Sequence, residues 1–133
     1  MTHLLDTDTC IALLRGVPGV LEIAARQVPD DLALSSITRY ELLFGAARCP
    51  EARREIETVK VNRFLETLHE IPFDSEAADL AARLRAGLEA KGSPIGPMDL
   101  LIAATARANH LILVSGNQKE FKRIPKLKLE SWM

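Results

Sequence analysis

The sequence predicts an α/β protein with a central, mainly parallel sheet covered by helices on both faces. Short apolar runs alternate along the chain with longer stretches of helical character, which is the pattern of such folds. Of its 133 residues, 47% are hydrophobic and 26% are charged, the usual balance of a folded domain with a real core. We therefore expect one domain over residues 1–133.

The first third of the chain contains two expected strands. Residues 3–5 and residues 32–35 are short apolar runs, each followed by a polar residue and a helical segment. Between them, a short helix over residues 9–15 is expected to end at Gly16 and to restart after Pro18.

The middle of the chain is expected to be mostly helical. Ser36 is a favoured N-cap for a helix over residues 37–48, and residues 52–68 repeat apolar side chains on one side of a second helix. Residues 70–73 look like a strand, in which Pro72 indicates a sheet edge or a strand end.

The last third completes the alternation. A helix is expected over residues 76–90, and Pro97 suits the first position of a nearly all-apolar, buried helix over residues 98–108. Residues 111–114 are apolar throughout, as an interior strand is, whereas residues 127–129 alternate and predict a peripheral strand.

Acidic residues stand where this sheet would collect a ligand. Asp6 directly follows the first strand, Glu41 is in the second turn of a helix, and Asp99 is in the first turn of another. Carboxyl ends of parallel strands and helix starts face the same rim, so we expect these groups to converge. Each also has a simpler explanation: Asp6 as a helix cap, Asp99 as an anion favoured by the helix dipole, and Glu41 as a partner of Arg48.

Several carboxylates in one pocket repel one another, so a proton or a cation must be present. The neighbouring sequence supplies oxygen ligands and no cluster of His or Cys, which favours a hard cation, Mg2+ or its substitute Mn2+. Such an ion held by a few carboxylates suits the hydrolysis of phosphodiester bonds.

Four motifs then match one family in the right order. The sequence resembles PIN-domain ribonucleases, specifically VapC-type toxins, over essentially its whole length. The motifs are residues 4–8, residues 35–46, residues 95–104 and residues 113–121. The resemblance implies a PIN-like three-layer α/β/α sandwich, divalent-metal-dependent endoribonuclease activity on RNA, a homodimer, and a VapB-like antitoxin that blocks the acidic groove.

The resemblance also assigns roles to residues. It makes Asp6, Glu41 and Asp99 the metal-binding acids, and it places Ser115 at a Ser or Thr position near the site. It also makes Asn117 a catalytic residue, at a position where many relatives have a fourth acid. Asp8, where Asn is common, either compensates for that acid or is simply an anion at a helix start.

Other functions remain open at this level. The spacing of Asp6 and Asp8 after a strand is also found in haloacid-dehalogenase-like phosphatases, although the later Lys and acidic pair of those enzymes are missing. A PIN nuclease that is not a toxin, or a PIN-like module that binds RNA or protein without cutting, is a further alternative.

The chain lacks an apolar run long enough for a membrane helix and a signal-like start, so we expect a cytoplasmic protein without a membrane partner. Cys10 and Cys49 are expected to be reduced, buried thiols. The basic residues between 119 and 128, with Glu120 the sole acid among them, form either an ordinary solvated face or a track for a phosphate backbone.

Overall fold

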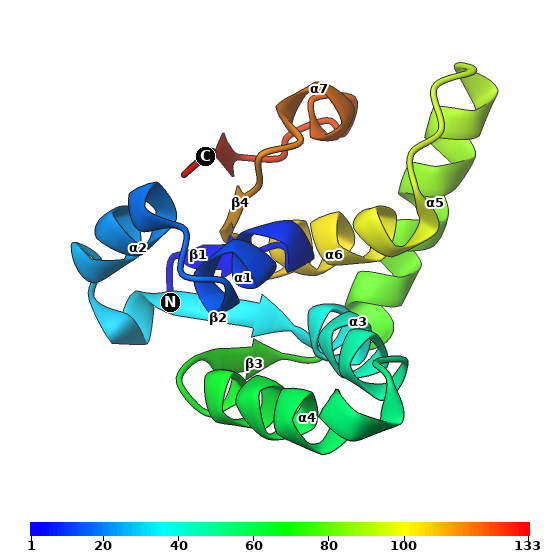
Figure 1. Cartoon of the computed structure of the whole chain (residues 1–133). Coiled ribbons are helices and arrows are strands. Elements are labelled where there is room, and N and C mark those ends of the chain that lie inside the picture. The colour runs from blue at the N-terminus through cyan, green and yellow to red at the C-terminus, as the bar shows by residue number, and fades with distance from the viewer.

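The computed structural model describes all 133 residues, and a five-stranded parallel sheet forms its centre (Figure 1). Every pair of neighbouring strands is parallel, and their spatial order is β3-β2-β1-β4-β5. The strands are β1 (His3–Leu5), β2 (Leu32–Ser35), β3 (His69–Ile71), β4 (Ile112–Val114) and β5 (Leu129–Glu130). The predicted sheet is confirmed, and β3 is an edge strand as expected, although it spans residues 69–71 and ends before Pro72 rather than covering residues 70–73.

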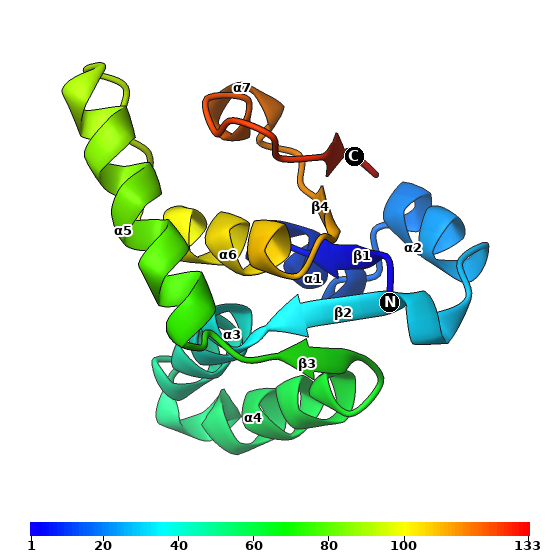
Figure 2. The same ribbon diagram turned by 180° about the vertical axis from the view of Figure 1, so that it is seen from behind.

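Helices cover both faces of the sheet. Side chains of α5 and α6 form one buried cluster with the strands, and side chains of α1 to α4 form a second. Helices α5 and α6 lie behind the sheet in Figure 1 and in front of it in Figure 2. The helices are α1 (Thr7–Leu14), α2 (Pro18–Ala25), α3 (Ser36–Ala47), α4 (Glu51–Leu65), α5 (Ser75–Ala90), α6 (Pro97–Ala108) and α7 (Gln118–Phe121), with a 3₁₀ turn η1 (Pro29–Asp31).

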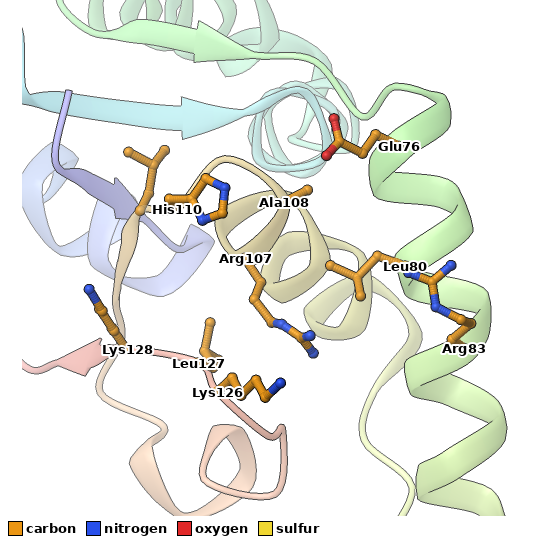
Figure 3. Close-up of a pocket in the computed structure, with 10 residues that line it drawn as sticks. Glu76, Leu80, Arg83, Arg107, Ala108, His110, Lys126, Leu127 and Lys128 are labelled. Carbon is orange, nitrogen blue, oxygen red and sulfur yellow. The ribbon is translucent and has the colours of Figure 1, made fainter.

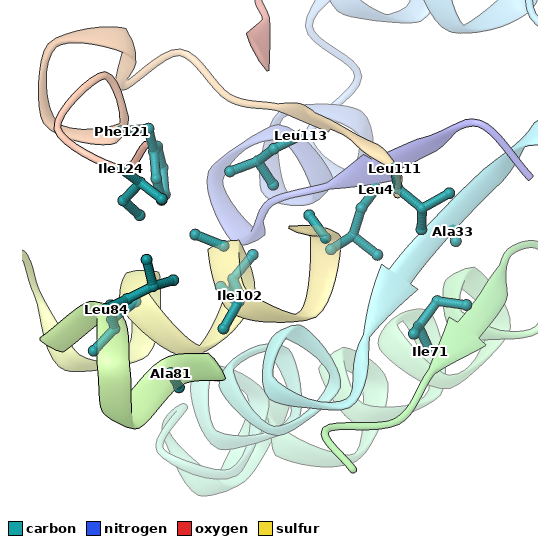
Figure 4. Close-up of a cluster of buried hydrophobic side chains, with 14 of the residues drawn as sticks. Leu4, Ala33, Ile71, Ala81, Leu84, Ile102, Leu111, Leu113, Phe121 and Ile124 are labelled. Atoms are coloured by element: carbon teal, nitrogen blue, oxygen red, sulfur yellow. The ribbon is translucent and has the colours of Figure 1, made fainter. Parts of the chain in front are cut away.

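Successive residues of the central strands point to opposite faces. Leu4 and Leu113 belong to the cluster beneath α5 and α6, which surrounds the fully buried Ile102 (Figure 4). Leu5 and Val114 belong to the cluster beneath the other helices. Because each strand is buried on both faces, it must be apolar at consecutive positions, and this made the central strands visible in the sequence.

The starts of α1 and α3 lie earlier than expected because of their caps. Ser35, not Ser36, is the N-cap of α3: its backbone is extended and its hydroxyl accepts a hydrogen bond from the Thr38 N–H at 3.1 Å. Helix α1 begins at Thr7 rather than at residue 9, because Asp6 caps it in the same way. Both shifts follow from the side chain that reaches the free N–H groups of the first turn.

Other boundaries also differ. The fourth helix ends at Leu65 rather than residue 68, β5 lies at residues 129–130 rather than 127–129, and the short helix α7 was not expected. Both cysteines are free, but only Cys10 is buried, whereas Cys49 is partly exposed. No helix in the structure has both the length and the apolar character needed to cross a bilayer.

Candidate acidic active site

Asp6 lies at the centre of the site, where β1 ends beside β4. The two strands are paired, and the Asp6 N–H donates to the Val114 carbonyl at 3.0 Å, so Asp6 and Ser115 leave the sheet side by side. The Asp6 carboxylate accepts a hydrogen bond from the Thr9 N–H at 2.9 Å and a further one from the Ser115 side chain. Its side chain is therefore fixed at the end of the sheet, with only 3% of the residue exposed.

The buried position of Asp6 makes its negative charge costly. Burial raises the pKa of the Asp6 carboxyl, although hydrogen bonds from Ser115 and Thr9 act in the opposite direction. Burial, followed by the charge of Asp6, also raises the pKa of the neighbouring Cys10 thiol well above its usual range. Cys10 thus stays a protonated thiol and is not a thiolate ligand, and Asp6 forms no ion pair with a basic side chain.

Asp99, in the first turn of α6, shows that the acidic residues gather. Burial, followed by the charges of four other acids, raises the pKa of Asp99 from 3.8 to about 6. In decreasing order of effect these are Glu120, Asp6, Glu41 and Asp8, which come from α7, the end of β1, α3 and α1. The structure thus brings the three predicted acids and Asp8 to one end of the sheet, and it adds a fifth acid.

Glu41 is oriented by a hydroxyl group rather than by a basic side chain. The Thr7 hydroxyl donates to the Glu41 carboxylate at 2.6 Å, and it also lies 3.1 Å from the Thr38 hydroxyl. The alternative in which Glu41 pairs with Arg48 is wrong, because the Arg48 guanidinium instead lies over the Phe44 ring, 5.4 Å from its centroid. Thr7 at the start of α1 therefore orients the carboxylate of Glu41 on α3.

Glu120 is the acid that the sequence did not reveal. Its carboxylate accepts hydrogen bonds from the Gly96 N–H and from the Asn117 side-chain amide, each at 2.8 Å. These two bonds, in that order, and then the charge of Arg123 lower the pKa of Glu120. A Cβ atom on Gly96 would lie 3.6 Å from an Asp99 carboxylate oxygen and 3.8 Å from a Glu120 one, so both acids flank the same point.

The remaining predicted residues have supporting positions. Asn117, expected with the catalytic group, donates its amide to Glu120, and its N–H donates to the Ser115 hydroxyl at 3.0 Å. Asp8 is exposed and acts on Asp6 and Asp99 through its charge. Glu120 stands on α7, three residues after the N-cap Asn117, and its place in the motif over residues 113–121 together with this spacing was the sequence signal for it.

The groups that could bind a metal ion in the acidic site share one chemistry. They are carboxylate oxygens, with no His or thiolate among them, which is the chemistry that Mg2+ and Mn2+ prefer. No three acidic, His or Cys side chains are arranged closely enough to hold an ion as they stand. The chemistry of the donor set therefore fits a hard divalent cation, and the carboxylates would have to approach one another to share it.

Fold and site together define a class of protein: parallel α/β proteins with a group of acids at the carboxyl ends of the central strands. The model of the PIN domain matches residues 3–127 of the chain. The tRNA(fMet)-specific endonuclease VapC of Salmonella typhimurium is 34% identical to it over 132 residues, covering 99% of this chain and 98% of the relative. Ribonuclease VapC2 of Rickettsia felis is 38% identical over 136 residues, with the same coverage.

Solved structures agree with these relatives. A chain of DNA-bound VapBC from Salmonella typhimurium superposes with a TM-score of 0.93 at 34% identity, covering 100% of this chain and 99% of that one. A chain of Rickettsia felis VapBC2, bound to a promoter DNA fragment, gives 0.86 at 37% identity, with both chains fully covered. The chain therefore belongs to the PIN-domain family and, within it, to the VapC ribonucleases. This membership replaces the phosphatase alternative.

Proposed function

We propose that this protein is a metal-dependent endoribonuclease that hydrolyses RNA phosphodiester bonds, and that it is the toxin of a VapBC-type toxin–antitoxin pair. The observation that supports this most is the group of acids around Asp99. Burial and the charges of these neighbours raise the pKa of Asp99 to about 6. Relatives of full length named as an endonuclease and a ribonuclease support the same activity.

Asp6, Glu41 and Asp99 are the proposed ligands of one Mg2+ ion, for which Mn2+ substitutes. Glu120 takes the place of the fourth acid, held there by the amide of Asn117. When bound, the ion supplies positive charge that polarises the phosphate and activates a water for attack.

The protein's contribution is to fix these carboxylates before the substrate arrives. Asp6 is held by the backbone of α1, Glu41 by the hydroxyl of Thr7, and Glu120 by the Gly96 N–H at the start of α6. Asp6, Glu41 and Glu120 thus each have a hydrogen-bond donor from a different segment, so the fold itself orients these three acids. Asp99 has no such donor, and it must lose its proton before it binds a cation.

Partners are proposed on the same basis. The solved relatives are VapBC complexes, and we propose a VapB-like antitoxin and a cytoplasmic location for this chain as well. A homodimer is supported by exposed apolar side chains on α3 and α4. Tyr40 and Phe44 are stacked with centroids 6.2 Å apart, and both are more than half exposed, as is Ile56.

Cleavage of labelled RNA tests the activity. The protein should cut RNA with Mg2+ or Mn2+ and not with EDTA, and Asp99→Asn should lower the rate by about 100-fold or more. Asp79→Asn, an exposed acid on α5, is the matched control and should cut normally. Absence of cleavage with either metal would favour a PIN-like module that binds without cutting.

A growth assay tests the toxin role separately. Expression of the wild-type chain without an antitoxin should stop growth, whereas expression of Asp99→Asn should not. RNA cleavage in vitro without any effect on growth would instead indicate a PIN nuclease that is not a toxin.

A further inference from the structure

A basic pocket lies at the opposite end of the sheet from the acidic site. Its volume is about 340 Å³, and α5, the end of α6, and the segments that precede β4 and β5 form its walls (Figure 3). His110 and Leu111 stand directly before β4, whereas Ser115 follows it, so the two sites occupy opposite ends of the strands. The charged side chains that line the pocket are Glu76, Arg83, Arg107, Lys126 and Lys128.

The pocket has an excess of positive charge that the protein does not neutralise. Four permanent cations line it against one acid, and none of the four takes part in any ion pair of the structure. Arg107 and Lys126 extend toward the same space from different segments (Figure 3). Cations that converge without a partner repel one another, and an anion in the pocket would remove this cost.

The backbone around the pocket is also unusual. His110 and Lys126, with φ of 57° and 62°, are the two non-glycine residues with a left-handed backbone, and both line the pocket. This conformation is unfavourable for residues with a Cβ and persists where the surrounding structure enforces it. Leu80, Leu111 and Leu127 complete the wall with aliphatic groups, which limit the water around the cations and so strengthen their attraction for an anion.

A run of basic residues connects this pocket with the acidic site. It starts at Lys119 on α7, beside Glu120 in the sequence. It continues through the exposed Lys122 and Arg123 and ends at Lys126 and Lys128 in the pocket wall. Helix α6 also connects the two sites, because Asp99 of the acidic site is in its first turn and Arg107 of the basic pocket is in its last turn. Arg107 lies eight positions after Asp99, about 12 Å along the helix axis, or about four phosphates of a stacked strand.

We propose that the basic pocket holds backbone phosphates of the RNA, about four or more nucleotides from the bond that is cut. The proposal rests on the nuclease function proposed above. Phosphodiester groups fit because they present a regular row of negative charges. This row can neutralise the positive charges of the basic residues that start on α7 and those of the pocket together.

Binding of a 12-nucleotide single-stranded RNA with a fluorescent label tests the pocket, measured by anisotropy in EDTA at several salt concentrations. The variant Arg107→Gln/Lys128→Gln removes two pocket cations. The matched control Arg53→Gln/Arg63→Gln removes two exposed, unpaired arginines from α4, on the other face of the sheet.

The pocket variant should bind more weakly, and the slope of log affinity against log salt should decrease by about 0.7 per lost phosphate contact, about 1.4 in all. The control should change neither quantity. The variant Arg107→Lys/Lys128→Arg, which keeps both charges, should behave like the wild type. In Mn2+, the pocket variant should raise KM for cleavage and leave kcat unchanged.

Equal slopes for the wild type and the pocket variant would overturn the proposal, as would equal losses in the control. Loss of binding in the charge-preserving variant would assign the effect to packing and would also overturn it. If a 12-residue polyglutamate displaces the RNA from the wild type but not from the pocket variant, the pocket binds acidic protein instead. Because binding is measured without metal, failure of cleavage alone would reject the nuclease function and leave the pocket result standing.

Discussion

Replacement of Asp99 by Asn measures the repulsion within the acidic site. Asparagine keeps the shape of the side chain and removes its charge. Burial and the neighbouring acids raise the pKa of Asp99 from 3.8 to about 6. A shift of roughly two units corresponds to at most about 3 kcal/mol. The carboxyl is only half-buried, so solvent screening reduces the expected gain in unfolding free energy to about 1–2 kcal/mol.

The effect should depend on pH in one direction. The pKa of Asp99 is higher in the folded protein than in the unfolded chain, so the folded state binds more protons between these two values. The stability that protonation provides is fully present below pH 3.8 and is lost as the pH rises through about 6. Asp99→Asn should therefore be more stable than the wild type at pH 7.5, and the difference should vanish as the pH falls toward 4.

Urea unfolding followed by circular dichroism in EDTA measures this difference. Asp79→Asn serves as the control, because its carboxylate is exposed on α5, and no pH-dependent gain is expected for it. An Asp99→Asn protein that is less stable than the wild type at pH 7.5, with a normal control, would refute the view that unbalanced carboxylates repel one another in the acidic site.

Three further predictions concern the residues that hold the acids. Asp6→Ala should be about 1 kcal/mol less stable to urea than Asp6→Asn, because Asn still caps α1, while both should lose RNA cleavage; equal stability would argue against the cap. Glu120→Ala should reduce RNA cleavage more than Asn117→Ala, since the Glu120 carboxylate faces the site. A larger loss for Asn117→Ala would instead support the sequence-based assignment of Asn117 as the catalytic residue. Thr7→Val should weaken Mn2+ binding by about 10-fold because Glu41 loses its donor, whereas Thr7→Ser should not.

The sequence predicted those features that depend on neighbouring residues. The strand that precedes Asp6 and the strand over residues 112–114 are buried on both faces, so they appear as uninterrupted apolar runs. The acid directly after the first strand had to lie at the rim of the sheet. Asp99 could be placed because Pro97 marks the start of its helix, and a charge on so apolar a helix indicated a site.

Features that depend on distant contacts could not be predicted. Glu120 lies on a four-residue helix, too short for any hydrophobic period, and its hydrogen bond reaches Gly96, 24 positions earlier in the chain. The cap of α3 was misplaced by one residue because two serines stand side by side, and only the backbone angles distinguish them. The basic pocket joins three segments whose cations are far apart in the sequence, so only the run near the C-terminus was visible.

Titration of the metal-free protein with Mn2+, followed by electron paramagnetic resonance, tests the central claim most directly. If Asp6 at the end of β1, Glu41 on α3 and Asp99 on α6 share one divalent ion, the wild type should bind one Mn2+ per chain. Asp6→Asn and Asp99→Asn should each abolish that binding while the protein remains folded. A wild type that leaves Mn2+ free at saturating concentration, or two variants that bind it normally, would contradict the account.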